Sequence, residues 1–316
     1  MLKRNVFKSL IYLATIAFLL SLGGCKELVL LHPKGPVGQD ETWLIIISFI
    51  LMLIVVVPVY VMVFLFTRKY RASNTKATYM PKWTHSTKIE WVVWLVPIAI
   101  IIALSYLTWV QTDHLDPYKP IASDKKPIQV EVVSTDWNWL FIYPEEHIAV
   151  TNELVFPANV PVSFKLTSAS VMTSFFIPQL GSQMYAMAGM QTKLNLMATE
   201  QGIFDGHNME YSGNGYHTMT FKAKAVTEEQ YREWLEKAKN SQHKMDMATY
   251  NEFSNPNINY PIKLFADVEP NLFNIILHQY MDWMGKKPMK NMKMKNMQQP
   301  EMSDSGLMEI KQRKEE

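Results

Sequence analysis

Two long runs of residues without a charge constrain this chain more than any other feature of its sequence. One runs from Trp43 to Phe66 and the other from Trp91 to Val110. As α-helices, both are long enough to cross the ~30 Å hydrocarbon core of a bilayer, where a helix satisfies its own backbone hydrogen bonds. The sequence therefore predicts a two-helix transmembrane anchor over residues 43–110, with a connecting loop at 67–89.

The charges beside these runs predict how the anchor is oriented. The outer flanks carry the acidic residues Asp40, Glu41, Asp113 and Asp116. Short loops rich in lysine and arginine stay in the cytoplasm, so we expect loop 67–89 to be cytoplasmic and the segments on either side of the anchor to be periplasmic. The loop has no acidic residue and carries six basic ones, which are Arg68, Lys69, Arg71, Lys76, Lys82 and Lys88.

The only cysteine of the chain, Cys25, ends a predicted bacterial lipoprotein signal. A basic start precedes an apolar run from Leu10 to Leu20, and the small residues of LGGC (Leu22–Cys25) follow it. We expect residues 1–24 to be a signal peptide, Cys25 to become the lipidated mature N-terminus with acyl chains such as palmitate, and residues 25–42 to form a periplasmic segment. The alternative is a plain secretory signal with a spare thiol. A lone cysteine also excludes an intrachain disulfide and an all-cysteine metal site.

Residues 111–226 are predicted to form a periplasmic all-β domain. Runs at 128–133, 162–167 and 217–224 alternate apolar and polar side chains, as strands with one buried face do. Prolines and glycines separate the runs. We expect seven or eight short strands, which suit a sandwich or a barrel.

Residues 227–284 are predicted to form a helical C-terminal extension. Thr227 and Gln230 have the spacing of a capping box, which marks the start of a helix. A second helix is expected from about Asn271 to Trp283. The apolar faces are expected at Tyr231, Trp234, Leu235 and Ala238 in the first helix and at Leu272, Ile275, Ile276 and Gln279 in the second.

The C-terminal tail, residues 285–316, is rich in lysine, methionine and glutamine, so we expect it to be disordered. Residues 281–308 include eight methionines, and thioether sulfur is a soft ligand for Cu(I). Weak copper binding and a flexible tail without fixed geometry are the two interpretations. The flexible tail is the favoured interpretation, because it needs no defined arrangement of ligands.

The sequence gives little support for a cofactor or a nucleic acid bound by this chain. A net charge of +2 is too small to indicate nucleic-acid binding. Neither apolar run contains a histidine that would ligate haem. His207 and His217 have no cysteine or carboxylate partner in a recognised metal-binding pattern. Any haem is therefore expected in a partner chain.

Five motifs point to a known family: PKGPVG (33–38), KIEWVVWLVP (88–97), DWNWLFIYP (136–144), VMTSFFIPQLGSQMYAMAGM (171–190) and YSGNGYHTM (211–219). Together they resemble subunit II of the haem-copper oxidases. The likeness reaches to about residue 285 and is closest to the proteobacterial ubiquinol oxidases of the cytochrome bo type. It implies a membrane-anchored, cupredoxin-like β-sandwich in the bacterial inner membrane.

The resemblance also implies that a copper site has been lost. In the cytochrome c oxidases of this family, the two loops similar to residues 171–190 and 211–219 hold a binuclear copper centre. A thiolate-bridged centre requires cysteines, and the sole cysteine lies in the signal region, so we expect neither this copper nor cytochrome c as a donor. Met172 and Tyr216 stand at the two histidine positions, Asn208 and Ser212 stand at the two cysteine positions, and only Met219 keeps a ligand residue.

The implied function is that of a non-catalytic subunit of a proton-pumping quinol oxidase, which oxidises ubiquinol and reduces oxygen to water. The haems, the haem-associated copper and the quinol site would belong to subunit I, and smaller membrane subunits would complete the complex. Without a copper site, Trp137 and Trp139 would serve packing. The rival functions are a menaquinol-oxidising version of the complex and a free-standing periplasmic lipoprotein that binds copper through its tail.

Glu90 is the one ionisable residue at the cytoplasmic start of the second run. From its position alone, it is a carboxylate at the beginning of a helix, where the macrodipole favours a negative charge. The resemblance gives it another role, because a glutamate at the matching point lies at the cytoplasmic mouth of the proton channel in related oxidases. We therefore predict that Glu90 helps to form the proton-uptake path.

Overall fold

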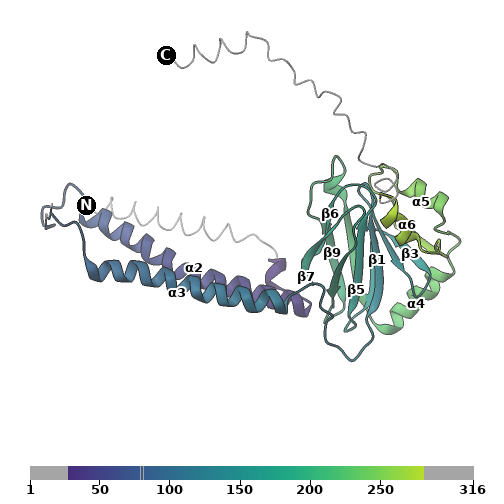
Figure 1. The fold of residues 1–316 in the computed structure, drawn as a ribbon, viewed down its shortest axis with the longest axis horizontal. Helices are drawn as coiled ribbons and strands as arrows, with labels where there is room; N and C mark the ends of the chain where they lie inside the picture. The colour runs from purple at the N-terminus through teal and green to yellow at the C-terminus, as the bar shows by residue number, and fades with distance from the viewer. Residues whose placement is uncertain (1–27, 79, 81, 281–316) are drawn as a thin grey trace, which may run out of the picture. The chain divides into compact units, whose positions relative to one another are not determined.

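The computed structural model describes residues 28–78, 80 and 82–280, and shows two long helices followed by a β-sandwich with further helices (Figure 1). The helices and 3₁₀ turns are η1 (Val29–Leu31), α2 (Pro36–Lys69), α3 (Thr87–His114), η2 (Tyr216–Thr218), α4 (Glu228–Lys239), α5 (Met247–Phe253) and α6 (Leu272–His278). The strands are β1 (Ile128–Ser134), β2 (Trp139–Tyr143), β3 (Ile148–Thr151), β4 (Glu153–Pro157), β5 (Val162–Ser168), β6 (Thr173–Ile177), β7 (Gly181–Ala186), β8 (Thr192–Leu196), β9 (Gly202–Asn208), β10 (Thr220–Val226) and β11 (Leu264–Ala266).

Helices α2 and α3 contain the two predicted apolar runs. Both are long and apolar enough to cross a membrane, and their most apolar stretches are not buried within the chain. Side chains such as Phe64 and Trp94 are therefore exposed. This exposure is what a bilayer or a partner helix would cover, because apolar surface of this extent is costly in water.

The sandwich consists of two sheets. One has the strand order β11-β3-β2-β1-β5-β8 and the other has the order β4-β10-β9-β6-β7. Ten strands lie between residues 128 and 226, so the prediction of seven or eight was wrong. The excess arises where residues 139–157 fold into three strands. His147 and Asn152 adopt positive φ values of 57° and 54° there, which allows the chain to reverse within very short turns.

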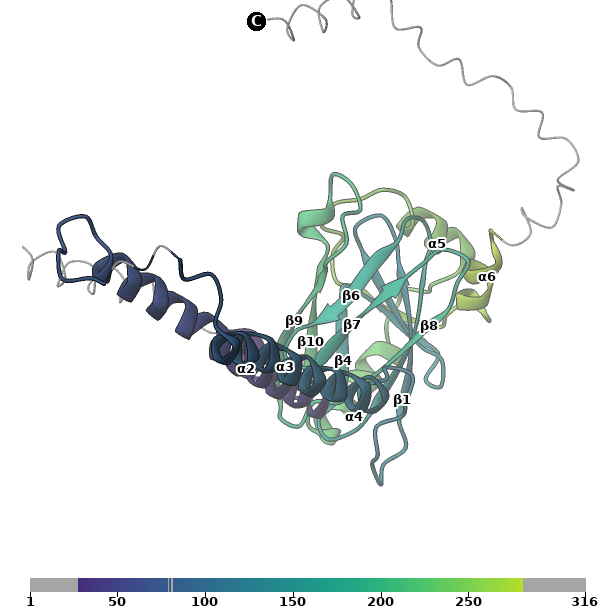
Figure 2. The same ribbon diagram turned by 60° about the vertical axis from the view of Figure 1, so that its left-hand side comes forward.

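Strand β2 is buried on both faces because the chain has two apolar cores. Trp139, Phe141 and Tyr143 belong to the core between the sheets. Leu140 and Ile142 point the other way, into a second core formed with α5 and α6. Figure 1 shows these helices near β3, and in Figure 2 they lie across the sandwich from β9.

The C-terminal extension agrees with the prediction in its first helix and differs from it further on. The capping box of Thr227 and Gln230 is confirmed, and α4 buries Tyr231, Leu235 and Ala238. Helix α5 and strand β11, which joins the larger sheet beside β3, were not predicted. Helix α6 ends at His278, and its buried residues are Leu272, Phe273, Ile276 and Leu277. Ile275 and Gln279 are exposed, so the predicted stripe was wrong at these two residues.

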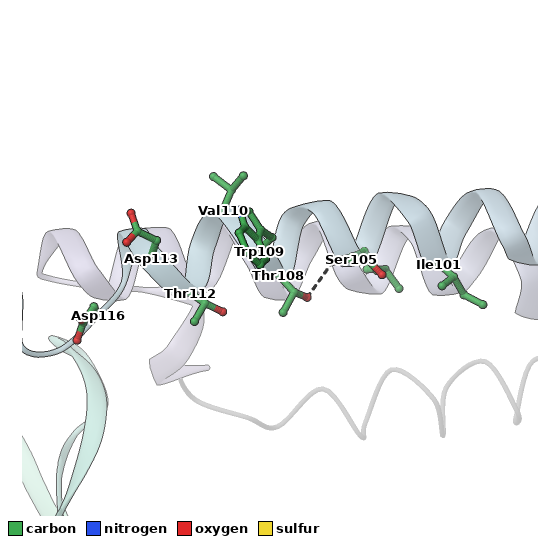
Figure 3. A pocket seen from close by; sticks show the side chains of 9 residues that line it. Ile101, Ser105, Thr108, Trp109, Val110, Thr112, Asp113 and Asp116 are labelled. Carbon is green, nitrogen blue, oxygen red and sulfur yellow. Dashed lines mark hydrogen bonds between the residues drawn. The ribbon is translucent and has the colours of Figure 1, made fainter.

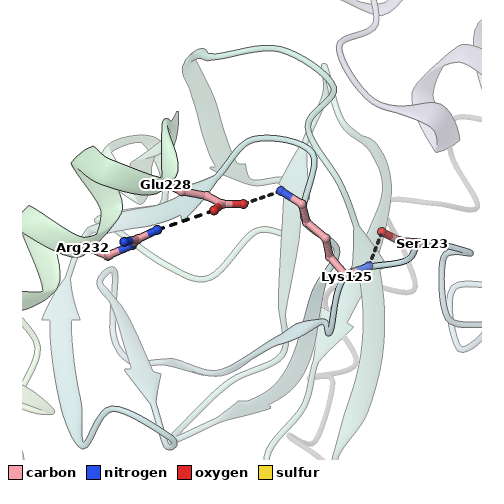
Figure 4. Close-up of polar contacts among 4 residues, drawn as sticks. All are labelled: Ser123, Lys125, Glu228 and Arg232. Carbon is pink, nitrogen blue, oxygen red and sulfur yellow. Dashed lines mark hydrogen bonds and ion pairs between the residues drawn. The ribbon is translucent and has the colours of Figure 1, made fainter.

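The segment between α3 and β1 is tied to α4 by charged side chains (Figure 4). The Lys125 ammonium forms an ion pair with Glu228, whose other carboxylate oxygen lies 3.8 Å from Arg232. The hydrogen bond and the charge of Lys125 lower the pKa of the Glu228 carboxyl. All of these groups are exposed, so the ion pair orients the segment and adds little to the free energy of folding.

The PKGPVG motif (33–38) joins α2 to the sandwich. Lys34 donates its backbone N–H to the Gln179 oxygen at 2.7 Å, and Gly38 donates to the Leu180 oxygen at 3.1 Å. A Cβ atom on Gly35 would lie 2.4 Å from the Met197 backbone oxygen. Only glycine fits there, which explains why the motif needs this residue where α2 begins at Pro36.

Candidate functional site at the end of the sandwich

The residues assigned by resemblance to the lost copper site gather at one end of the smaller sheet. Asn208 is the last residue of β9 and pairs with Phe175 of β6. Met172 directly precedes β6, whereas Ser212 and Tyr216 lie in the loop between β9 and β10. We call residues 208–219 the remnant loop. This loop rises beyond the strand ends near β6 in Figure 1.

The Asn208 amide group is buried and fully hydrogen-bonded. Its Oδ1 accepts the backbone N–H of Ser174 at 2.8 Å and that of Glu210 at 3.0 Å. Its Nδ2 donates to the Glu210 backbone oxygen at 2.8 Å and to Ser212 Oγ at 3.1 Å. Asparagine has two acceptor lone pairs and two donors, so this side chain has used every one of them.

Ser212 and Met219 complete the same network. Ser212 Oγ lies 4.0 Å from the Met219 sulfur, within hydrogen-bonding range for sulfur. The Asn208 backbone N–H donates to the Met219 oxygen at 3.1 Å. Met219 is almost completely buried, at 1% exposure. The structure thus brings Asn208, Ser212 and Met219 together through side-chain and backbone contacts.

Tyr216 and Met172 occupy different surroundings. The Tyr216 ring packs at a tilt on Tyr211, with 5.8 Å between centroids. Met172 is 42% exposed. The strand predicted over residues 217–224 was wrong at its start, because Tyr216–Thr218 forms the turn η2, and Thr218 donates its N–H to the Gly215 oxygen at 3.0 Å.

Trp137 supports the remnant loop, a role that the sequence did not reveal. Its indole Nε1 donates to the Ser212 backbone oxygen at 2.9 Å. A Cβ atom on Gly215 would lie 2.3 Å from the ring, so the loop passes closer to the indole than any other residue would allow. Trp137 adopts φ 72°, an uncommon backbone state that surrounding contacts must hold in place. The glycines of YSGNG were the available signal.

Trp139, by contrast, is a core residue, as predicted. It is fully buried and meets Phe175 and Phe221 edge-on, at 5.5 Å and 5.6 Å between centroids. The Phe175 and Phe221 rings stack on each other at 5.0 Å. These rings fill the space between the two sheets directly beneath the remnant loop.

The side chains at this end of the sandwich do not fit a thiolate-bridged copper centre. An amide, a hydroxyl and a phenol stand where such a centre needs two thiolates and an imidazole. The Asn208 amide is already saturated by hydrogen bonds. Within residues 28–280, excluding residues 79 and 81, no three His, Cys, Asp or Glu side chains gather as a possible metal site.

Glu90 lies in the first turn of α3, apart from the sandwich. Its Oε1 lies 3.0 Å from His85 Nδ1 and accepts the Ser86 backbone N–H at 3.3 Å. The side chain is about half exposed. In the isolated chain it therefore acts as a carboxylate at the start of a helix. Cys25, the predicted lipidation site, lies outside the described residues.

A groove beside α3 gives the anchor a partly polar side (Figure 3). Ser105, Thr108 and Thr112 line it together with Ile101 and Trp109. Thr108 Oγ1 donates to the Leu104 backbone oxygen at 2.8 Å. Small hydroxyl residues on a membrane helix allow a second helix to approach closely.

Comparison with known proteins agrees with this architecture. Residues 141–226 match the family model described as cytochrome c oxidase subunit II, periplasmic domain, and residues 239–284 match the model described as COX aromatic rich motif. The second model contains α5, β11 and α6. The helices that form the second core therefore lie within the second matched segment.

Three relatives extend the match to most of the chain. Cytochrome bo(3) ubiquinol oxidase subunit 2 of Pseudomonas aeruginosa is 52% identical over 280 residues, 89% of this chain and 84% of the relative. Ubiquinol oxidase subunit 2 of Acetobacter aceti is 46% identical over 310 residues, which are 98% of this chain and 100% of the relative. Quinol oxidase subunit 2 of Bacillus cereus is 36% identical over 257 residues, which are 81% of this chain and 88% of the relative. The chain belongs to the family of subunit 2 of the haem-copper quinol oxidases.

Proposed function

We propose that this chain is the non-catalytic subunit II of a respiratory oxidase that oxidises ubiquinol, reduces oxygen to water and pumps protons. The observation that carries the proposal is the match to a ubiquinol oxidase subunit 2 over 98% of this chain and the whole of that relative. Such coverage includes both membrane helices and the sandwich. The shared architecture therefore suits the same place in a complex.

The network around Asn208 supports a quinol as the electron donor. In this proposal, hydrogen bonds from Asn208 and packing against Trp137 hold the remnant loop, which a copper centre holds in the cytochrome c oxidases. A chain without that centre has no site through which to receive electrons from cytochrome c. Electrons would then enter the complex from ubiquinol at subunit I.

The role of this chain is to support subunit I from the membrane and from the periplasm. The exposed apolar surface of α2 and α3 and the hydroxyl groups of Ser105, Thr108 and Thr112 suit packing against membrane helices of a partner. The haems and the haem-associated copper belong to subunit I in this proposal. Smaller membrane subunits complete the complex.

The proposed location is the bacterial inner membrane, with the sandwich in the periplasm. Loop 67–89 faces the cytoplasm because of its basic residues. The proposed boundaries are those expected from the sequence: residues 1–24 signal, 25–42 periplasmic segment, 43–110 anchor, 111–226 sandwich, 227–284 extension and 285–316 tail.

Cys25 is the proposed lipidated N-terminus of the mature chain. Its position after LGG, at the end of an apolar run, supports this assignment. Mass spectrometry of the intact mature chain tests it. A mass that corresponds to diacylglyceryl-modified Cys25 is expected, and a mature chain that begins at another residue or carries a free Cys25 thiol would contradict it.

Glu90 is proposed to lie at the mouth of the proton-uptake path. With loop 67–89 in the cytoplasm, the first turn of α3 faces the compartment that supplies the protons. The carboxylate is hydrated enough to exchange protons with water. The His85 imidazole lies 3.0 Å from the same carboxylate as a polar neighbour.

Menaquinol is the alternative substrate, because the features of this subunit do not distinguish it from ubiquinol. The relative from Bacillus cereus is named simply as a quinol oxidase subunit 2. Extraction of the quinones from the source membrane distinguishes the two substrates. Ubiquinone as the dominant species is expected, and a membrane that contains only menaquinone would contradict the ubiquinol assignment.

Purification of the tagged chain in mild detergent tests the proposed function. We expect it to bring a haem-containing chain with it and to show the visible absorption of haem. A chain that elutes alone, without haem, and binds copper through its Met-rich tail would instead support a free-standing copper-binding lipoprotein.

A further inference from the structure

An open cavity of about 720 Å³ lies where α2 ends and the connecting loop begins. Lys69 and Asn74 line its polar side. Phe66, Tyr70 and Trp83 form an aromatic wall, and the Tyr70 and Trp83 side chains are 58% and 60% exposed. Rings of tyrosine and tryptophan prefer the level of the lipid headgroups, where one end is apolar and the other is wet.

The charge around this cavity is positive and uncompensated. Loop 67–89 carries six basic residues and no acidic one. None of the six forms an ion pair with a carboxylate of the described residues. Glu90, which follows the loop, is engaged by His85 and Ser86.

The Lys69 ammonium is also not needed to cap the helix. Asn74 Nδ2 donates to the Lys69 backbone oxygen at 2.5 Å, and the Tyr70 N–H donates to the Phe66 oxygen at 2.8 Å. The Phe66 and Lys69 carbonyls at the end of α2 therefore have donors other than the Lys69 ammonium. The Lys69 side chain lies 5.3 Å from the centre of the Tyr70 ring, a cation–π contact that holds it beside the cavity.

We propose that this cavity binds the phosphate headgroup of an anionic phospholipid of the phosphatidylglycerol type. The Lys69 ammonium faces the phosphate, the Asn74 amide lies beside the headgroup, and the aromatic wall of Phe66, Tyr70 and Trp83 covers the glycerol and the start of the acyl chains. A free phosphate would leave that wall exposed to water. Basic clusters at the cytoplasmic end of a membrane helix attract anionic lipids. Each cation close to the membrane surface raises the affinity for such a lipid about fivefold.

Native mass spectrometry of the full chain released from nanodiscs tests this site. Nanodiscs expose both leaflets, so the result depends neither on the proposed orientation nor on the oxidase assignment. Discs of phosphatidylcholine with a minor fraction of phosphatidylglycerol are used. We expect the chain to retain phosphatidylglycerol in preference to phosphatidylcholine, whereas equal retention of the two lipids would overturn the proposal.

Matched variants separate a defined site from diffuse attraction. Lys69→Gln is expected to lower the retention of phosphatidylglycerol about fivefold, and Lys69→Arg is expected to preserve it. Lys76→Gln removes one cation from the same loop, but Lys76 does not line the cavity. Because the attraction between charges decays with distance, this variant should lower retention less than Lys69→Gln does. Equal losses for Lys69→Gln and Lys76→Gln would show that only the net charge matters and would refute the site.

The aromatic wall distinguishes a lipid from a soluble phosphate. Trp83→Ala is expected to lower the retention of phosphatidylglycerol, because it removes the surface that covers the glycerol and acyl chains. Added glycerol phosphate should not displace the lipid. Displacement by glycerol phosphate at equal concentration, or full retention in Trp83→Ala, would contradict a lipid site.

Discussion

The indole Nε1 of Trp137 donates a hydrogen bond to the backbone oxygen of Ser212 at 2.9 Å. The bond joins the turn between β1 and β2 to the remnant loop, 75 residues further along the chain. The Trp137 ring also packs against Gly215, where no side chain would fit. One tryptophan therefore helps to fix the path of the remnant loop.

Trp137→Phe is predicted to lower the free energy of unfolding by about 1 kcal/mol more than Trp234→Phe does, because only the first loses a hydrogen bond. Trp234 is a suitable control since its buried Nε1 has no partner among the described residues. Both substitutions replace an indole with a phenyl ring, so the loss of ring atoms is the same. Chemical unfolding of the purified chain measures the difference, and equal penalties would show that the bond to Ser212 is not important.

Restoring four residues together is predicted to restore a copper centre. The variant is Met172→His, Asn208→Cys, Ser212→Cys and Tyr216→His, with Met219 left in place. Copper should then give the purple absorption of a mixed-valence pair, because thiolates are available to bridge the metals. The starting chain should not show this absorption at the same copper concentration. A variant that folds but stays colourless would mean that the loop alignment is wrong.

Tyr143→Phe is predicted to destabilise the sandwich by about 1–3 kcal/mol at neutral pH. The buried Tyr143 hydroxyl donates to the Val155 oxygen at 2.8 Å and accepts the Val155 N–H at 3.0 Å. Val155 lies in β4, an edge strand of the smaller sheet. Phenylalanine at position 143 would leave the buried backbone N–H and C=O of Val155 without their hydrogen-bond partner.

The penalty for Tyr143→Phe should also depend on pH. Burial raises the pKa of the Tyr143 hydroxyl well above its usual value. A tyrosine in the unfolded chain loses its proton near pH ~10, so the contribution of Tyr143 is complete below that pH and is lost progressively above it. Urea unfolding of both proteins at increasing pH should therefore give a penalty that shrinks above pH ~10. A penalty that is constant across this range would contradict the assignment.

Glu90→Gln is predicted to lower oxygen-reduction turnover of the assembled oxidase while haem content and assembly persist. The substitution keeps the size and most hydrogen bonding but removes the group that exchanges a proton. Glu90→Asp should retain part of the activity. Glu228→Gln is the control, because it neutralises an exposed carboxylate at the start of α4, outside the anchor. Full turnover in a correctly assembled Glu90→Gln complex would return Glu90 to a purely structural role.

The anchor and the start of α4 were predictable because local sequence determines them. A long run without charges has few alternatives to a membrane helix, and the Thr227–Gln230 capping box acts within one turn. The PKGPVG motif was visible in the sequence, but the reason for Gly35 is its close approach to Met197, in a segment far along the chain that follows β8.

The strands around β2 could not be predicted from alternation. Leu140 and Ile142 are buried as completely as Trp139 and Phe141, because a second core covers the outer face of the sheet. A strand that is buried on both faces has no polar side to reveal its period. Helix α6 was misjudged at Ile275 for a related reason, since which face is buried depends on where the sheet lies.

The residues of the remnant loop were predictable from the sequence, but the contacts that hold the loop in place were not. The replaced residues followed from the resemblance, whereas the saturation of the Asn208 amide and the support from Trp137 depend on contacts between distant segments. The positive φ of Trp137 gave no signal in the sequence, because this backbone state is uncommon for a tryptophan.

The electron donor of the isolated complex distinguishes a quinol oxidase from a cytochrome c oxidase. The oxidase is isolated through a tag on this chain, and oxygen consumption is measured with ubiquinol and, separately, with reduced cytochrome c. We expect rapid oxygen consumption with ubiquinol and none above background with cytochrome c. Oxidation of cytochrome c by the isolated complex, or a tag that recovers no ubiquinol oxidase activity from membranes that contain it, would contradict the proposed function.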